Sequence, residues 1–179
     1  MSGTWRIIVF LFLVILGAAC NQSTENNTLK PGDQMPLFEL LDQDGELYRM
    51  EDVVGEKNLV VYFYPKDDTP GCTKEACKFR DDFEVFTDLN ALVIGISGDS
   101  PESHQEFKEK YNLPFTLLSD EESKVQELFG VEDAFMGLVS GRVTFVIDMD
   151  GVVQYTFNSM SNAEQHVDEA RKILEELNR

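Results

Sequence analysis

The apolar run at residues 59–64, which leads into a turn carrying a cysteine, constrains this chain more than any other feature. The run is short and rich in β-branched and aromatic side chains, as in a buried strand. Turn-forming residues follow in the segment 65–72 (PKDDTPGC), and apolar side chains beyond Cys72 then recur at helical spacing. We therefore expect Cys72 at or near the N-terminus of a helix.

This position favours a reactive thiol. Unpaired backbone N–H groups and the positive end of the helix dipole stabilise an anion at a helix N-terminus. The thiolate is the form of cysteine that attacks electrophiles. The sequence therefore predicts that Cys72 is a nucleophile.

A second cysteine, Cys77, follows five positions later. In a helix this separation gives a rise of about 7.5 Å and places the Cα atoms roughly 8 to 9 Å apart, beyond the ~7 Å limit for a disulfide. We infer two steps: Cys72 is oxidised in the folded helix, and Cys77 condenses with it after local unfolding. The alternative is that Cys77 only fills space in the helix.

The N-terminal segment has the pattern of a signal peptide over residues 1–19. Arg6 precedes an apolar stretch that is too short to span a membrane. The small residues before Cys20 resemble the lipobox of bacterial lipoproteins, in which this cysteine is lipidated. Lipid on Cys20 would leave two of the three cysteines as a pair. An ordinary cleaved secretory signal is the alternative.

The composition and length suggest how the rest of the chain is organised. Polar residues 20–29 predict a flexible tether, and residues 30–179 suffice for one domain. The net charge of −18 argues against binding to nucleic acid or electrostatic attraction to anionic lipids. We therefore expect the lipid alone to hold the protein at the cell envelope, facing the periplasm or the exterior.

The hydrophobic patterns predict an α/β fold with a mixed central sheet flanked by helices. The expected helices start near Cys72, Ser100, Glu122 and Asn162, the last running to Leu177. Strands are expected at 38–41, 47–50, 59–64, 91–97, 115–118, 142–148 and 152–157, the first two and the last two forming hairpins.

The order of these elements and the pattern Pro65-x-x-x-Thr69-x-x-Cys72 resemble the thioredoxin-fold peroxiredoxins. The position of Cys77 and the segments 62–66, 69–73 and 115–120 are similar to the bacterioferritin comigratory, or Q-type, branch. The likeness covers about residues 29–174. It implies a thioredoxin-like fold and a thiol peroxidase that reduces hydrogen peroxide and organic hydroperoxides.

The resemblance also implies roles for individual residues. Cys72 is then the peroxidatic cysteine. Once oxidised, it forms a disulfide with Cys77, and a thioredoxin-like reductant restores both thiols. Thr69 can place its hydroxyl near the sulfur, although a turn or N-cap threonine is the alternative. Pro65 would shield the site, although turn chemistry explains it equally well. Arg142 matches the active-site arginine of the family; without the family it would be a surface residue at a strand end.

No cofactor or metal is expected, and we expect a monomer. His104 and His166 lie alone in Glu-rich helical settings without metal-ligand spacing, which predicts surface positions. Two other functions remain open. A membrane-tethered thiol-disulfide oxidoreductase would use Cys-x-x-Cys, whereas four residues separate this pair. A redox-sensing or copper-handling interaction protein could use the same cysteines, although metal binding would need further ligands.

Overall fold

The computed structural model describes residues 28–134 and 139–179. The first elements along the chain are β1 (Glu39–Asp42), β2 (Leu47–Arg49), the 3₁₀ helix η1 (Met50–Asp52), β3 (Asn58–Phe63), α1 (Pro70–Asp81), α2 (Phe83–Asp88) and β4 (Ala91–Ser97). They are followed by α3 (Pro101–Tyr111), β5 (Thr116–Ser119), α4 (Lys124–Leu128), β6 (Asp133–Ala134), β7 (Val139–Ser140), β8 (Val143–Ile147), β9 (Val153–Asn158) and α5 (Ala163–Leu177).

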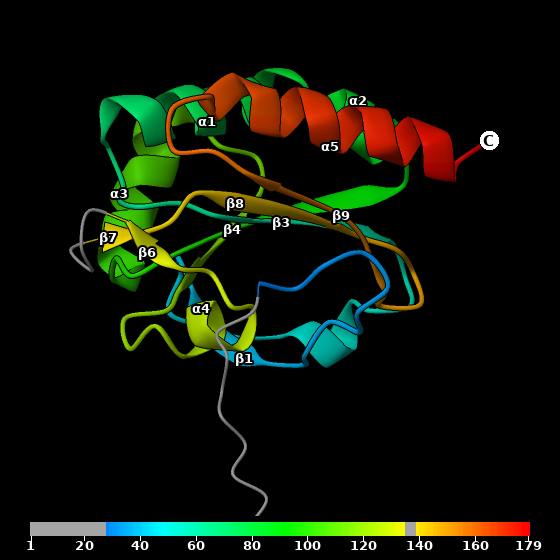
Figure 1. Cartoon of the computed structure of the whole chain (residues 1–179). Helices are drawn as coiled ribbons and strands as arrows, with labels where there is room; N and C mark the ends of the chain where they lie inside the picture. Colours follow the sequence, from blue (N-terminus) through cyan, green and yellow to red (C-terminus); the bar gives the residue numbers. More distant parts are fainter. Residues whose placement is uncertain (1–27, 135–138) are drawn as a thin grey trace, which may run out of the picture.

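The main sheet is mixed and has the strand order β2-β1-β5-β4-β3-β8-β9. The central strand β3 pairs in parallel with β4 and antiparallel with β8. Helices α1, α2 and α5 lie on one face of this sheet, and α4 lies on the other (Figure 1). This arrangement confirms the α/β fold that the hydrophobic patterns predict.

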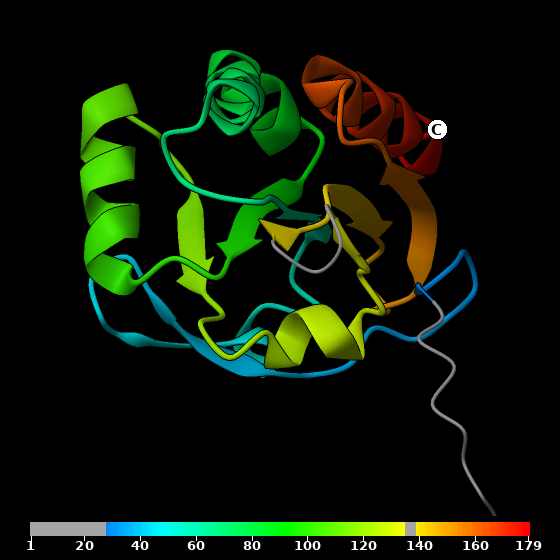
Figure 2. The same ribbon diagram turned by 60° about the vertical axis from the view of Figure 1, so that its left-hand side comes forward.

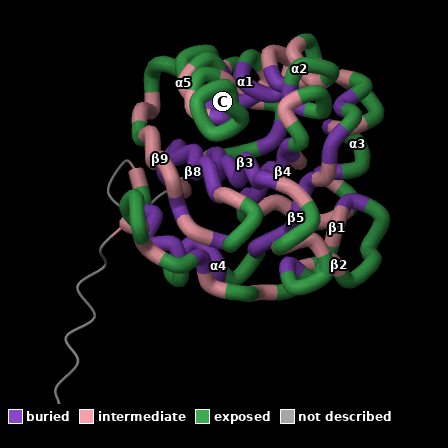
Figure 3. The backbone as a smooth tube through the Cα atoms, turned by 90° about the vertical axis from the view of Figure 1, so that its right-hand side faces the viewer, coloured by how far each residue is buried: buried purple, intermediate pink, exposed green. Residues whose placement is uncertain are grey.

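Strand β3 is buried on both faces and therefore contributes to two cores. Val60, Tyr62 and Tyr64 pack with residues of α1, α3 and α5, whereas Leu59, Val61 and Phe63 pack with residues of α4 and η1. The alternation follows from the two-residue period of a strand. Figure 3 shows the buried backbone concentrated in β3, β4 and β8, and the exposed backbone on the outer helix faces.

The segment from β3 to α1 confirms the strand, turn and helix that residues 59–72 predict. The turn carries the chain from the middle of the sheet to one covering layer, with α3 and α5 on either side of α1 (Figure 2). The helix is shorter than the apolar stripe suggests, because it ends at Asp81 and a separate helix, α2, begins at Phe83. The short β6–β7 hairpin was not predicted.

The N-terminal predictions lie partly outside the described residues, namely the signal peptide at 1–19, Cys20 and the tether up to residue 27. Thr28 and Leu29, which the sequence assigns to the tether, are bound to the domain. The Thr28 hydroxyl donates to the Gly130 carbonyl at 2.7 Å, and the Leu29 N–H donates to the Phe129 carbonyl at 3.0 Å. Within the described residues, no helix has the length and apolar character needed to cross a membrane.

Candidate active site

Cys72 is the third residue of α1, and its side chain is buried, with the residue 1% exposed. Thr69 is the N-cap residue, but its side chain makes no capping hydrogen bond. Its hydroxyl instead donates to the Lys66 carbonyl at 3.0 Å. The N–H groups at the start of a helix lack partners inside the helix, so this end of α1 favours an anion.

Arg142 comes to Cys72 from the distant strand β8. It lies directly before this strand, two residues from Thr144 and four from Val146. Its side chain is therefore on the same face of the sheet as theirs, toward α1 and α5. Its Nη2 donates to the Cys72 Sγ at 3.4 Å, and the residue is 3% exposed. Arg142 is therefore buried beside the thiol, and the interpretation as a surface arginine is wrong.

Gly71 permits this close approach. A Cβ atom added at Gly71 would lie 3.0 Å from the Arg142 Nη2. The sequence shows Gly71 only as a turn former. The structure adds a second role: Gly71 has no side chain to obstruct Arg142, which passes over the first turn of α1.

Glu75 contacts Arg142 on the buried face of α1. Its Oε2 pairs with the Arg142 Nη1, and the Glu75 side chain is fully buried. Burial raises the pKa of Glu75 to about 8, although Arg142 opposes the shift. Burial would lower the pKa of Arg142, but its contacts with Glu75 and Cys72 outweigh burial and raise it. The guanidinium therefore stays charged next to the sulfur. The sequence analysis missed Glu75, although it lies three positions after Cys72 on the same helix face.

His166, predicted to lie at the surface, is fully buried on α5 behind this group. Its Nε2 lies 2.9 Å from the Ser159 carbonyl oxygen, and its Nδ1 lies 2.8 Å from the Thr144 hydroxyl and 3.7 Å from the Glu75 Oε1. Burial lowers the pKa of His166 to about 4, so the ring is neutral at pH 7. Its spacing from Ala170 and Leu174 would have revealed the buried face.

His104 is also fully buried, which corrects the second surface prediction. It lies in α3, and its Nδ1 is 2.9 Å from the Asp67 Oδ2. Neither histidine belongs to a metal-binding group: among the described residues, no cluster of three or more His, Cys, Asp or Glu side chains could hold a metal ion.

The structure places the remaining predicted site residues around the same turn and helix. Pro65 is half-buried and lines a cavity next to Lys66 and Ser140. Cys77 is half-buried on another side of α1, and neither cysteine is in a disulfide. Its groove is lined by Pro70, Thr73, Lys74, Lys78, Asp81 and Glu164.

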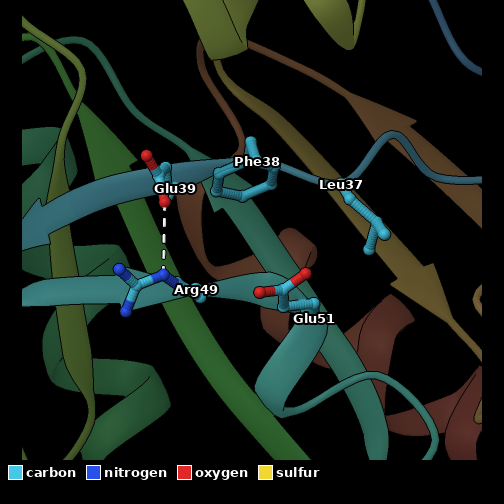
Figure 4. Close-up of a pocket in the computed structure, with 5 residues that line it drawn as sticks. All are labelled: Leu37, Phe38, Glu39, Arg49 and Glu51. Carbon is cyan, nitrogen blue, oxygen red and sulfur yellow. Dashed lines mark ion pairs between the residues drawn. The ribbon is translucent and has the colours of Figure 1, made fainter.

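A separate shallow pocket lies on the β1–β2 hairpin. It is lined by Leu37, Phe38, Glu39, Arg49 and Glu51 (Figure 4). The Glu39 Oε2 and the Arg49 Nε are 3.3 Å apart, and both side chains are largely exposed. An exposed ion pair of this kind contributes little to stability or to chemistry. The hairpin forms the sheet edge opposite β9, so this pocket is not part of the thiol site.

Comparisons with known proteins identify the family. Residues 31–156 match the model of the AhpC/TSA family. The chain is 52% identical over 146 residues to the putative chloroplastic peroxiredoxin Q of Oryza sativa subsp. indica, covering 82% of this chain and 67% of the relative. It is 51% identical over 146 residues to the chloroplastic peroxiredoxin Q of Sedum lineare, covering 82% and 78%.

Solved structures agree. The peroxidoxin BcpB of Mycobacterium tuberculosis superposes with a TM-score of 0.78 at 37% identity, covering 83% of this chain and 98% of that one. A cysteine-to-serine mutant of PrxQ from Xylella fastidiosa gives a TM-score of 0.78 at 26% identity, covering 86% and 99%. With a thiol held at a helix start beside a buried arginine, this chain belongs to the AhpC/TSA family as a thioredoxin-fold peroxiredoxin of the Q type, a thiol-dependent peroxidase.

Proposed function

We propose that Cys72 is the peroxidatic residue of this enzyme. The observation that carries the proposal is the hydrogen bond from Arg142 to the Cys72 sulfur inside the first turn of α1. The Cys72 thiolate attacks one peroxide oxygen, an S–O bond forms, and the O–O bond breaks. The sulfur is oxidised to sulfenic acid, and the other oxygen takes up a proton and leaves as water or an alcohol.

The neighbouring residues stabilise and orient this reaction. The charged Arg142 stabilises the thiolate and the negative charge that develops on the departing oxygen. Thr69 lies at the N-cap directly before the reactive turn, where rotation of its side chain would direct the hydroxyl to a bound peroxide. Pro65, which follows the end of β3, shields the site from water. The substrates are hydrogen peroxide and organic hydroperoxides.

Cys77 is proposed as the resolving cysteine of an atypical two-cysteine mechanism. Both thiols are free, and α1 is continuous through both positions, so their separation forbids a bond in this state. After the first turns of α1 unwind, the Cys77 thiol attacks the Cys72 sulfenic acid. A disulfide forms and one water leaves, which balances the oxidation.

A thioredoxin-like dithiol is the proposed reductant, in keeping with the family. One of its thiolates attacks the disulfide and releases the first enzyme thiol, leaving a mixed disulfide. Its second thiol then attacks this mixed disulfide, so the second enzyme thiol leaves and the reductant carries the disulfide. Cys77 is the more accessible of the two cysteines before unwinding, because it lines an open groove. No metal or cofactor takes part in this proposed cycle.

The proposed location is the cell envelope. A signal peptide at residues 1–19, lipid on Cys20 and a tether up to residue 27 would hold a monomeric peroxidase domain at a membrane. The supporting observation is the sequence pattern before Cys20. Metabolic labelling with a radioactive fatty acid tests it: wild-type protein should incorporate label and Cys20→Ser should not, and labelling of both proteins would contradict it.

Cysteine variants test the catalytic proposal. Purified protein should consume hydrogen peroxide with a dithiol reductant, and Cys72→Ser should abolish this activity. Cys77→Ser should stop turnover and accumulate sulfenic acid at Cys72, which a dimedone adduct detects by mass spectrometry. Peroxide consumption at an unchanged rate in Cys72→Ser would exclude Cys72 as the nucleophile.

A further inference from the structure

A second buried polar cluster lies on the other side of the β3–α1 turn, and none of the roles above uses it. It is centred on the Asp67 carboxylate, whose side chain is 4% exposed. Three side chains contact this carboxylate: Tyr64 Oη at 2.7 Å from Oδ1, and Ser103 Oγ at 2.8 Å and His104 Nδ1 at 2.9 Å from Oδ2. A buried charge with this many partners is strongly held in place.

Two of the partners, Tyr64 and Ser103, donate to the carboxylate through their hydroxyl groups. Burial and the Asp67 charge raise the pKa of Tyr64 well above its ordinary value, so the phenol keeps its proton and donates it. Ser103 and His104 lie in the first turns of α3, where the helix dipole also favours an anion. The His104 Nε2 lies 3.1 Å from the Leu118 carbonyl oxygen, which ties the ring to β5 as well.

The backbone of Asp67 is fixed from a different direction. Its N–H donates to the Asp99 Oδ2 at 2.8 Å, and that oxygen also accepts from the Ser97 hydroxyl at 2.7 Å. The middle of the turn is therefore held by α3, by the end of β4 and by the segment after it. Two residues later comes Thr69, and five residues later Cys72.

We propose that Asp67 is a positioning residue for the peroxide reaction: by joining the β3–α1 turn to α3 it fixes Thr69 and the first turn of α1. The proposal depends on the assignment of Cys72 and Thr69 above. Rate enhancement that comes from orientation is sensitive to displacements of about 1 Å. A turn that loses this buried link to α3 would present the peroxide to the sulfur with poorer alignment, while the thiolate itself would remain next to Arg142.

The neighbouring Asp68 offers a matched control. It has the same side chain one position later, but it is exposed and contacts Lys110 Nζ and Tyr111 Oη at 2.6 Å each on the surface of α3. Its φ of +55° is one that asparagine adopts readily. Asp68→Asn therefore removes an exposed ion pair, which is worth little, and keeps a side-chain oxygen that can accept from Tyr111.

The experiment compares Asp67→Asn with Asp68→Asn in a Cys77→Ser background. Two second-order rate constants of Cys72 are measured: oxidation by hydrogen peroxide, by competition with a haem peroxidase, and alkylation by iodoacetamide. Asp67→Asn should slow oxidation on the order of 10- to 100-fold and change alkylation less than about twofold. Asp68→Asn should change both rate constants less than about twofold.

Two outcomes would overturn the proposal: oxidation by Asp67→Asn as fast as by Asp68→Asn, or an equal fall in oxidation and alkylation. The second would show that the thiolate or the fold was lost rather than the alignment. If Asp67→Asn fails to fold, Ser103→Ala removes one of the two hydroxyl donors to Asp67 and should slow oxidation alone, on the order of threefold; no effect would overturn the proposal. Cys72→Ser in the same assay tests the peroxidatic assignment separately.

Discussion

Cys72 and Cys77 lie five residues apart on the same helix, but they differ in burial and in their neighbours. Cys72 is buried, and its sulfur accepts a hydrogen bond from Arg142. Cys77 is half-buried in an open groove between α1 and the start of α5, where Lys74 and Glu164 form a surface ion pair. Two thiols in one short segment can therefore have different chemistry.

The rotation of the helix explains this difference. Cys72, Glu75, Ala76 and Phe79 are spaced three and four residues apart and share the buried face of α1. Cys77 is displaced from Cys72 by about 140° around the helix axis. The comparison shows that the neighbours on each helix face, rather than the nearness of the two thiols in sequence, distinguish them.

The largest expected effect comes from removing the cation beside Cys72. Arg142→Gln should slow oxidation of Cys72 by hydrogen peroxide on the order of 10²- to 10³-fold, because a preorganised donor to the reacting atoms is lost. Alkylation of Cys77 should change less than about twofold, since this cysteine makes no contact with Arg142. Site-resolved mass spectrometry after timed labelling measures both cysteines.

Arg80→Gln is the matched control for this variant. Arg80 is another arginine of α1, close to Cys77 rather than to Cys72, and it contacts the Tyr111 carbonyl and Asp81. Equal slowing in Arg80→Gln and Arg142→Gln would show that a general loss of positive charge, rather than the contact with Cys72, determines reactivity.

A smaller effect is expected from filling the space under the arginine. Gly71→Ala puts a Cβ atom 3.0 Å from the Arg142 Nη2, so the guanidinium that donates to the sulfur has to shift by a few tenths of an ångström. Oxidation of Cys72 should slow about tenfold, as misplacement of a catalytic group predicts. Gly98→Ala is the control, because the nearest atom to its added Cβ is 3.8 Å away. Equal rate constants for the two variants would refute this role of Gly71.

The polar group behind Cys72 should give a pH dependence that the Cys77 side lacks. The pKa of Glu75 is about 8 in the folded chain against an ordinary 4.5, so the folded chain holds a proton that the unfolded chain has released. The pKa of His166 is shifted in the opposite direction, to about 4 from an ordinary 6.5. Its effect on stability therefore falls between these two pH values and ends near pH 6.5. From pH 6.5 to about 8, Glu75 should therefore lower the free energy of unfolding as the pH rises, by up to about 1.4 kcal/mol per pH unit.

Urea unfolding of Glu75→Gln checks this linkage. The variant should lose the decrease between pH 6.5 and about 8, even if its overall stability is lower because Arg142 stays buried without its partner. Glu164→Gln, which removes one partner of the exposed ion pair near Cys77, should show the same decrease in stability as wild type. If the free energy of unfolding of Glu75→Gln decreases as much over this pH range as that of wild type, other groups cause the pH dependence.

The smallest effect is expected at Cys77 itself. Cys77→Ser should leave the first oxidation of Cys72 within about twofold of wild type, because Cys77 lies on a different helix face. Rapid-mixing measurement of a single turnover gives this rate. A large decrease would mean that Cys77 already assists the attack on the peroxide before α1 unwinds.

Much of the fold was predictable because its signals are local. The strand at 59–64, the turn and the helix start at Pro70 follow from side-chain periodicity and turn residues, as does the Ser100 cap of α3, whose hydroxyl accepts from the Ser103 N–H. The break between α1 and α2 was missed because one apolar stripe continues across it. The β6–β7 hairpin was missed because its strands have two residues each.

The histidines show where local reasoning fails. A histidine in a Glu-rich helix has the composition of a solvent-exposed face, yet His104 and His166 are both buried. Their partners, Asp67 for one and Thr144 for the other, lie 37 and 22 residues away in sequence. Only packing of the helix against another element supplies the hydrogen bonds that make burial of an imidazole favourable.

By itself the sequence determined the reactive segment: a buried strand, a turn and a helix that starts next to Cys72, with Cys77 too far along the helix to bond without unwinding. These properties follow from neighbouring residues and from helix geometry. The tertiary structure decided what surrounds the thiol. Arg142 reaches it across 70 residues of sequence because β8 pairs with β3 and directs alternate side chains to the face under α1. Such contacts depend on sheet pairing between distant segments, which no local pattern specifies.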